Sequence, residues 1–235
     1  MTDEVVWDGS PEYRQRRYET YEAYVEHQAS KFKLLKLAKY TPGFKAALAP
    51  RIEALRPLIN TGGRNVLCLA ARNGAECEAW TEAHFLAIGI DLNPGEDNRF
   101  VVVGDFHALQ FPDGVFDVVF TNSLDHVFEL GKVVDEARRV LKPGGIFVAE
   151  VVRGSKDENG REPGPYEAVW WDSAIVVRDE IGRHAFDLVA TSPFDLPWVG
   201  DQYVFRKPEG VRGEDSVGKP GSRLRWLRSL VNSGT

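Results

Sequence analysis

Residues 115–152 read VFDVVFTNSLDHVFELGKVVDEARRVLKPGGIFVAEVV, and this stretch decides the fold. It begins and ends with apolar runs, 115–120 and 146–152, which have the length and β-branched composition of buried strands. Between them, residues 130–141 have the spacing of a helix whose buried face is formed by Val133, Val134, Ala137 and Val140. A Lys-Pro-Gly-Gly turn at 142–145 ends this helix, so the stretch predicts a strand, a helix and a second strand.

The same alternation extends in both directions along the chain. Before this stretch, the sequence predicts strands at 65–70, 85–90 and 100–103 and a helix at 76–83. After it, we expect a surface loop, a helix and an antiparallel pair of strands, at 153–165, 172–181, 185–191 and 202–206. Nearly continuous apolar strands that alternate with helices indicate an α/β protein, in which helices cover both faces of a parallel sheet.

The two ends of the chain differ from this central part. Residues 11–40 have the apolar spacing of one helix, and residues 44–59 that of two short helical pieces separated by prolines. We therefore expect a helical cap over residues 1–60, a ligand-binding α/β domain over 61–207 and a polar, basic tail over 208–235.

Composition excludes several classes of protein. The chain has 235 residues, with 29 Lys and Arg against 35 Asp and Glu, so its formal net charge is −6 and nucleic acid is not an expected partner. Cys68 and Cys77 belong to no metal-binding or disulfide pattern, so we expect neither a metal site nor a disulfide. No apolar run approaches the roughly 20 residues that span a bilayer, and the acidic N-terminus lacks a secretory signal, which predicts a cytoplasmic protein.

Polar residues follow the predicted strands at the edge of the sheet where α/β proteins bind ligands. Asp91 ends the second strand and is expected to accept hydrogen bonds from the hydroxyls of a ribose. Asp105 ends the third strand and is expected to accept the exocyclic amine of an adenine, with Phe106 packed on the ring. The alternatives are that Asp91 caps a helix or lies in a solvated loop, and that Asp105 only belongs to a turn after Gly104.

Three segments carry a resemblance to a known family: GIDLNPG at 89–95, GDFHALQFPDGVFDVVFTNSLDHV at 104–127 and EARRVLKPGGIFVAEV at 136–151. The chain resembles a class I S-adenosylmethionine-dependent methyltransferase of the type 11 family. The resemblance implies a Rossmann-like fold with a mostly parallel seven-stranded sheet, helices on both faces and an antiparallel edge strand. It also implies that S-adenosyl-L-methionine is the cofactor.

The first motif departs from this family. Cys68 replaces an acid, and Ala70 and Arg72 replace two glycines of the cofactor loop, whereas Gly74 is kept. Arg72 is a candidate partner for the carboxylate of the methionine moiety, and Glu76 for its ammonium group. Alternatively, Arg72 points to solvent and Glu76 only favours the start of its helix. Leu92, Asn93 and Asn122 complete the predicted cofactor contacts. The sequence A-A-R-N-G-A at 70–75 does not match the GxGxxG pattern of a dinucleotide-binding oxidoreductase.

Asp125 and His126 follow the fourth strand and are the candidate catalytic residues. A histidine can remove the proton of an oxygen acceptor, although a structural role for it is the alternative. We expect the acceptor to be a small or carbohydrate-like molecule that is methylated on oxygen. It would lie under aromatic residues that alternatively only pack, namely Tyr13, Tyr18, Tyr21, Tyr24, Tyr166, Trp170 and Trp171. The altered first motif leaves a second hypothesis open, a cofactor-binding sensor or partner subunit without catalysis.

The basic tail has a separate set of interpretations. Its last part, SRLRWLRSLVN at 222–232, interleaves arginines with apolar residues. As an amphipathic helix it is a candidate for peripheral contact with an anionic membrane surface. The alternatives are a frayed terminus and a contact in an oligomer of undetermined size.

Overall fold

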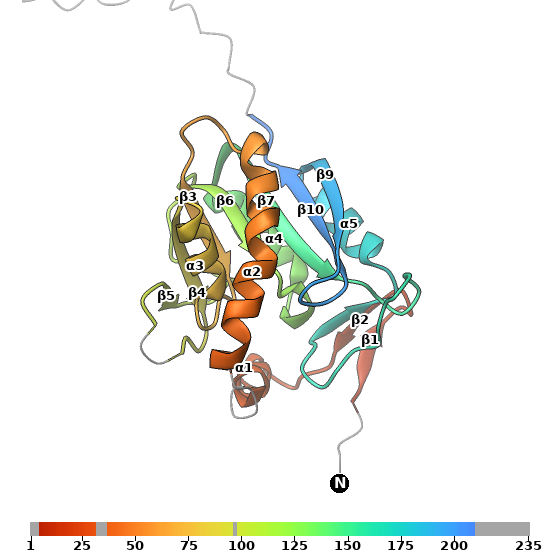
Figure 1. Cartoon of the computed structure of the whole chain (residues 1–235). Helices are drawn as coiled ribbons and strands as arrows, with labels where there is room; N and C mark the ends of the chain where they lie inside the picture. Colours follow the sequence, from red (N-terminus) through yellow and green to blue (C-terminus); the bar gives the residue numbers. More distant parts are fainter. Residues whose placement is uncertain (1–4, 32–36, 96–97, 210–235) are drawn as a thin grey trace, which may run out of the picture.

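The computed structural model describes residues 5–31, 37–95 and 98–209. A seven-stranded sheet forms its centre, in the order β5-β4-β3-β6-β7-β10-β9 (Figure 1). The strands are β3 (Asn65–Leu69), β4 (Leu86–Asp91), β5 (Val101–Val103), β6 (Phe116–Thr121), β7 (Leu141–Val152), β9 (Asp187–Phe194) and β10 (Gly200–Arg206).

The first five strands of this sheet are parallel, and β10 runs antiparallel to both β7 and β9. The prediction of a mostly parallel sheet with an antiparallel edge is therefore confirmed. The order reverses at β3, which pairs with β4 on one side and with β6 on the other. Such a reversal is the place where open α/β sheets bind ligands.

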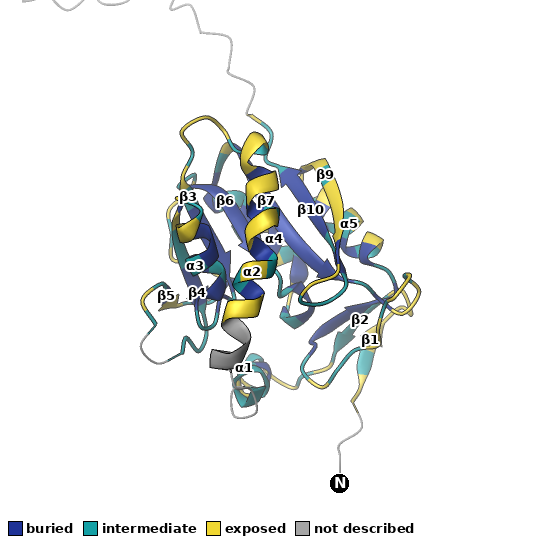
Figure 2. Cartoon of the chain, viewed as in Figure 1, coloured by how far each residue is buried: buried dark blue, intermediate teal, exposed yellow. Residues whose placement is uncertain are grey.

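Helices cover both faces of the sheet, which explains why its central strands β3, β6 and β7 are almost entirely buried. Alternate residues of these central strands enter two separate cores, as Leu67 and Val66 of β3 do. One core contains α4 (Leu130–Val140) and α5 (Ala174–Arg183), and the other contains α2 (Leu37–Leu55) and α3 (Ala75–Glu82). Figure 2 shows the central strands as almost entirely buried between these layers.

The prediction of one helix over residues 11–40 is wrong at its N-terminal end. β1 (Trp7–Gly9) and β2 (Tyr13–Arg16) are strands, and β2 pairs with β8 (Val169–Trp171) in a small antiparallel sheet. Within residues 11–31, α1 (Tyr21–Ser30) is the α-helix, and Thr20 precedes it and caps it with its side chain. Pairing with a strand more than 150 residues away outweighs the local helical pattern.

A second difference concerns the prolines of α2. The helix runs through Pro42 and Pro50, where the sequence predicted two short pieces, and ends before the short 3-10 segment η2 (Arg56–Leu58). Its buried face packs against the sheet and α3, and this burial offsets the lost backbone hydrogen bonds. The division into cap, domain and tail stays a prediction, although α2 packs on the sheet as an integral layer. The tail after residue 209 lies outside the described residues.

Three further findings concern only the described part of the chain. Both cysteines are buried free thiols. No group of three or more His, Cys, Asp or Glu side chains there is arranged to hold a metal ion. No helix there is long and apolar enough to cross a membrane.

Candidate functional site

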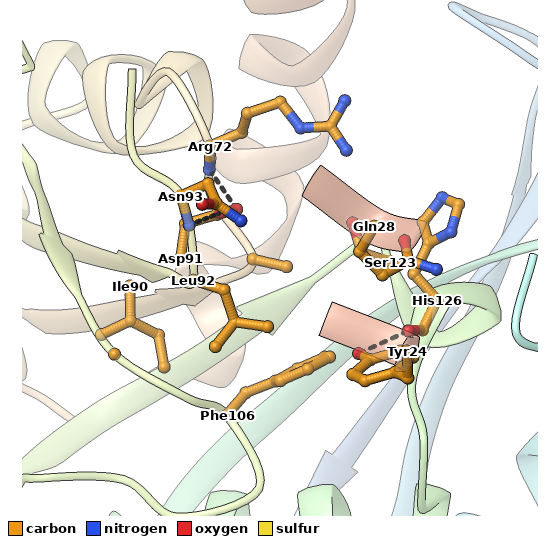
Figure 3. A pocket seen from close by; sticks show the side chains of 12 residues that line it. Tyr24, Gln28, Arg72, Ile90, Asp91, Leu92, Asn93, Phe106, Ser123 and His126 are labelled. Carbon is orange, nitrogen blue, oxygen red and sulfur yellow. Dashed lines mark hydrogen bonds between the residues drawn. The ribbon is translucent and has the colours of Figure 1, made fainter. Parts of the chain in front are cut away.

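A pocket lies at the carboxyl ends of the parallel strands, with about 480 Å³ of empty space including its open mouth (Figure 3). The segments that follow β3, β4, β5 and β6 form its walls, and α1 covers it. The lining residues are Tyr24, Gln28, Ala70, Arg72, Ile90, Asp91, Leu92, Asn93, Gly104, Phe106, Ser123 and His126. Six of the predicted cofactor residues are therefore brought together here, together with the predicted catalytic His126.

The loop after β3 keeps a glycine-like course although two glycines are replaced. Ala70 has φ of 52° and Arg72 has φ of 46°, in the left-handed region that side chains rarely adopt. Gly74 has φ of 80° and begins α3. A left-handed residue at every second position turns the backbone sharply around the pocket. The altered motif has therefore changed side chains while the path of the loop suits a cofactor.

Asp91 lines the pocket at the end of β4. Its Oδ2 accepts a hydrogen bond from the Arg72 backbone N–H at 3.0 Å, and its Oδ1 accepts one from the Asn93 N–H at 2.8 Å. Burial raises the pKa of Asp91, whereas these hydrogen bonds and the Arg72 charge oppose the rise. A carboxylate has room for about four donors, so both oxygens can still accept hydroxyl groups. This arrangement fits the predicted contact with a ribose.

Glu76 and Asn122 contact each other behind the pocket, where neither lines its wall. The Asn122 amide donates to Glu76 Oε1 at 3.0 Å, while the Ser123 hydroxyl donates to Asn122 Oδ1 at 2.9 Å. Glu76 Oε2 is buried and has no hydrogen-bond partner among the described residues. Burial raises the pKa of Glu76 to about 7. A buried oxygen without a donor is costly, so this carboxylate suits a cationic group of a ligand.

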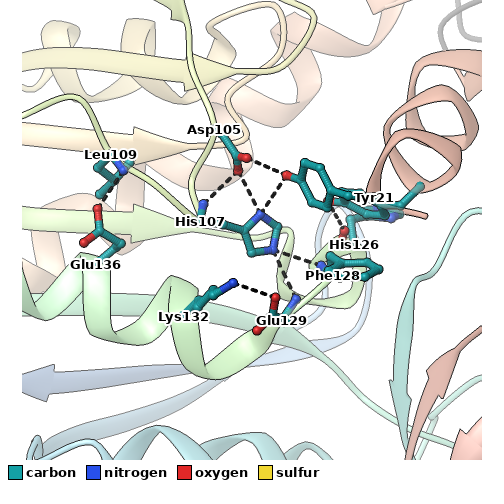
Figure 4. Close-up of polar contacts among 10 residues, drawn as sticks. Tyr21, Asp105, His107, Leu109, His126, Phe128, Glu129, Lys132 and Glu136 are labelled. Atoms are coloured by element: carbon teal, nitrogen blue, oxygen red, sulfur yellow. Dashed lines mark hydrogen bonds and ion pairs between the residues drawn. The ribbon is translucent and has the colours of Figure 1, made fainter. Parts of the chain in front are cut away.

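Asp105 has a different position from the one expected of an adenine contact. Its neighbours Gly104 and Phe106 line the pocket, but Asp105 itself does not. Its Oδ2 accepts from the Tyr21 hydroxyl of α1 at 2.5 Å, and its Oδ1 accepts from His107 (Figure 4). Burial opposes ionisation, but these hydrogen bonds outweigh it and hold the pKa of Asp105 at about 2. Asp105 thus ties α1 to the sheet, and its contact with adenine stays a prediction.

His107 supports this attachment of α1. Its Nε2 accepts hydrogen bonds from the backbone N–H groups of Phe128 and Glu129, both at 3.1 Å. The ring proton is therefore on Nδ1, 2.8 Å from Asp105 Oδ1. His107 also contacts the ring of Phe106 edge to face, with centroids 4.7 Å apart. It connects the end of β5 to the segment that precedes α4.

His126 lines the pocket from the 3-10 segment η3 (Leu124–His126), and both of its nitrogens have partners. Nδ1 lies 3.0 Å from the Tyr166 carbonyl oxygen and must donate to it. Nε2 lies 2.8 Å from the Lys31 ammonium and accepts from it. Burial lowers the pKa of His126, Lys31 adds to this shift and Asp125 acts against it. His126 is therefore a neutral ring whose lone pair is already occupied.

Sequence reasoning missed Lys31, Gln28 and Ser123. The signal that was available is helical spacing, because Tyr21, Tyr24, Gln28 and Lys31 recur every three or four residues along α1. Only the position of α1 in the structure shows that Tyr24 and Gln28 form part of the pocket wall.

The remaining predicted residues lie away from the pocket wall. Asp125 is buried, with its carboxylate 3.6 Å from Arg161 and 3.8 Å from His126 Nε2. Trp170 and Trp171 are buried in the core with stacked rings, so packing explains them. The catalytic roles of Asp125 and His126 stay predictions.

Comparison with known proteins agrees with this geometry. Residues 67–149 match the family model described as a methyltransferase domain. Squalene methyltransferase 1 of Botryococcus braunii is 32% identical over 114 residues, which cover 41% of this chain and 30% of that protein. Malonyl-[acyl-carrier protein] O-methyltransferase of Methylococcus capsulatus is 38% identical over 87 residues, which cover 36% of this chain and 32% of that protein. The chain thus matches about a third of the length of these relatives.

Solved structures share the fold. The 1,6-didemethyltoxoflavin-N1-methyltransferase of Burkholderia thailandensis superposes with a TM-score of 0.65 at 16% identity, covering 87% of this chain and 95% of that one. A possible histamine N-methyltransferase of Thermotoga maritima gives 0.56 at 17% identity, covering 78% and 98%. The fold is therefore that of the Rossmann-like methyltransferases. Residues 67–149, about a third of the chain, are thus similar to the methyltransferase-domain family.

Proposed function

We propose that the protein is an active S-adenosylmethionine-dependent methyltransferase that methylates a small molecule on oxygen. The observation that carries the cofactor assignment is the pair of carboxylates at the switch point of the sheet. Asp91 lines the pocket with room for hydroxyl donors, and no described residue donates to one buried oxygen of Glu76. These two groups suit the ribose and the ammonium of one extended cofactor.

The other residues of the pocket have distinct tasks in this proposal. Ile90, Leu92 and Phe106 supply apolar walls for the adenine ring. The left-handed Arg72 presents its guanidinium for the carboxylate of the methionine moiety. The bound cofactor supplies an activated methyl group on a sulfonium. The protein therefore needs mainly to align the acceptor and exclude water.

The proposal of a small-molecule acceptor is supported by the activities for which the relatives are named. These relatives include methyltransferases of squalene, of a phytyl hydroquinone, of sterols and of a malonyl group on a carrier protein. Their acceptor atoms differ, so oxygen as the acceptor atom is our proposal. A carbohydrate-like acceptor and a cytoplasmic location also stay proposals.

The divergent loop after β3 favours one alternative, a cofactor-binding protein without catalysis. Ala70 and Arg72 hold left-handed backbone angles, at a strain of the order of 1–3 kcal/mol each, where the first motif of the resembling family has glycines. The two functions differ in one observable, because only the enzyme converts S-adenosylmethionine to S-adenosylhomocysteine.

Thermal unfolding with either ligand tests the cofactor site. A ligand at about 100 times its dissociation constant stabilises a native site by about 2.7 kcal/mol. We expect this stabilisation in the wild type and in the surface control Asp179→Ala, and its loss in Asp91→Ala. No stabilisation at millimolar ligand would refute the proposal. Product formation with a panel of acceptors then separates the enzyme from the sensor.

A further inference from the structure

The Lys31 ammonium lies beside His126, which lines the pocket, and no carboxylate of the described residues pairs with it. Lys31 is half-buried at the C-terminal end of α1, one turn beyond the pocket residue Gln28. Its Nζ lies 2.8 Å from His126 Nε2 and 5.8 Å from the centre of the Tyr166 ring. Among the described residues, no carboxylate forms an ion pair with Lys31, whereas the nearby Arg161 pairs with Glu167 at 2.8 Å.

The surrounding charges do not neutralise this ammonium at close range. Burial lowers the pKa of Lys31 to about 8, and the guanidinium of Arg72 adds to this shift. The charges of Asp125 and Glu167 raise the pKa of Lys31, although neither forms an ion pair with it, and Arg161 offsets part of their effect. A poorly hydrated cation without an adjacent anion is unfavourable. Binding of an anionic group next to the Lys31 ammonium would therefore be favourable.

The partners of His126 exclude it as a ready proton acceptor. The Tyr166 carbonyl holds the ring proton on Nδ1, and the Lys31 ammonium occupies the lone pair of Nε2. His126 would have to release Lys31 before it could take a proton from an alcohol. An acceptor that arrives already ionised needs no such base.

We propose that the acceptor enters as an oxygen anion, a carboxylate or an ionised hydroxyl, and that the Lys31 ammonium binds this oxygen. The inference rests on the proposed function and names the chemical class of its acceptor. A lone pair of the anionic oxygen forms the new bond to the methyl carbon, and the electrons of the carbon–sulfur bond pass to the sulfur. The sulfonium becomes a neutral thioether, the acceptor becomes a neutral ester or ether, and no proton moves. His126 is a positioning residue that holds Lys31.

Binding of a simple anion tests the inference without knowledge of the natural acceptor. The probes are benzoate and the isosteric neutral benzamide, each titrated by NMR into the wild type with and without S-adenosylhomocysteine. We expect benzoate to bind at least about tenfold more tightly than benzamide, a difference of about 1.4 kcal/mol. Lys31→Met should abolish this preference and Lys31→Arg should retain part of it. The exposed control Lys132→Met, whose lysine is paired with Glu129, should keep all of it.

Turnover gives a second readout. With any acceptor found in a panel of matched carboxylates, phenols, alcohols and amines, Lys31→Met should raise KM at least about tenfold. The affinity of Lys31→Met for S-adenosylhomocysteine should equal that of the wild type. This equality also shows that the variant is folded.

Equal binding of benzoate and benzamide, no binding of either at about 50 mM, or turnover restricted to neutral alcohols or amines would overturn the inference. Preference for benzoate that survives in Lys31→Met would overturn it as well. A protein that binds benzoate through Lys31 but does not bind S-adenosylhomocysteine would instead refute the proposed function. The two failures are therefore distinguishable.

Discussion

Ala70 and Arg72 determine the shape of the cofactor loop at the scale of single residues. Both adopt left-handed backbone angles that glycine adopts without strain, and Ala70 lines the pocket. The strain is local, because the backbone N–H of Ala71 between them donates to the Ile90 carbonyl at 2.9 Å and anchors the loop to β4.

Ala70→Gly is expected to stabilise the protein. Glycine adopts φ near 52° freely, so we expect the free energy of unfolding to rise by about 1 kcal/mol. Urea unfolding measures this change. Ala71→Gly is the matched control, since Ala71 is buried and does not have a positive φ; it should destabilise. A loss of stability in both variants would contradict the inference that the backbone of Ala70 is strained.

Glu76 gives the protein a pH-dependent stability in the absence of ligand. Its pKa of about 7 exceeds the ordinary value of 4.5, so the folded state binds a proton that the unfolded chain releases between these values. This contribution is present below pH 4.5 and is lost as the pH rises to 7. Glu76→Gln should therefore remove this contribution and make the decline over this interval smaller than in the wild type.

The same substitution should weaken binding of the cofactor. We expect Glu76→Gln to match or exceed the wild type in melting temperature at pH 8, and to lose at least about tenfold in affinity for S-adenosylhomocysteine. Melting curves between pH 4.5 and 8, with and without ligand, measure both effects. Unchanged affinity would show that the buried oxygen does not contact the cofactor.

At the scale of elements, α1 forms one wall of the site, and its long-range hydrogen bonds include those of Tyr21, Tyr24 and Gln28. The Tyr21 hydroxyl donates to Asp105, the Tyr24 hydroxyl to the His126 carbonyl at 2.8 Å, and the Gln28 amide to the Tyr166 carbonyl at 2.9 Å. Tyr24 is the one buried residue of this helix, so polar groups at helical spacing dock it in place of a broad apolar face. Pocket closure therefore depends on a few hydroxyl and amide groups.

Tyr21→Phe should loosen α1. The variant loses a hydrogen bond to a charged carboxylate, which is worth about 1.5–3 kcal/mol. We expect faster amide hydrogen exchange in α1 and weaker binding of S-adenosylhomocysteine. Tyr18→Phe is the control, because its hydroxyl contacts His27 of α1 and so links the helix to the residues that precede it and not to the sheet. Equal exchange rates in both variants would contradict the role of Asp105 in holding α1.

At the scale of the whole molecule, binding and folding groups occupy opposite edges of the sheet. The cofactor residues follow the carboxyl ends of the strands, whereas Asp117 stabilises the other end. Its buried carboxylate accepts from the backbone N–H groups of Arg64 and Asn65 at 3.0 Å and from Lys142 at 2.9 Å. It thereby joins the segments that begin β3 and β7.

Asp117→Ala should destabilise the fold without affecting the cofactor site. Two buried backbone donors lose their acceptor, so we expect a loss of about 2–4 kcal/mol in unfolding free energy and an unchanged dissociation constant for S-adenosylhomocysteine. The exposed Asp113→Ala should change stability by less than about 1 kcal/mol. Chemical unfolding and calorimetric titration measure the two quantities. Weaker binding of S-adenosylhomocysteine by Asp117→Ala would contradict the conclusion that stabilising and binding residues lie at opposite edges of the sheet.

Most of the central sheet could be predicted because its signals are local. Runs such as residues 146–152 are apolar on both faces, and turns such as 142–145 end the helices. The strands β1 and β2 could not be predicted, since β2 exists through pairing with β8, which lies more than 150 residues later. The prolines of α2 wrongly predicted breaks in this helix. The helix is continuous because it is buried against the sheet, and this tertiary effect is not visible in the local sequence.

The sequence by itself determined the alternation of strands and helices in the α/β unit and the residues placed at its strand ends, because a parallel sheet brings those ends to one edge. Only the tertiary structure decided which atoms of these residues are free. Asp105 is occupied by Tyr21, 84 positions away, and His126 by Lys31, 95 positions away. Hydrogen bonds depend on the distance and direction between individual atoms, which are set by packing of segments that are remote in the chain.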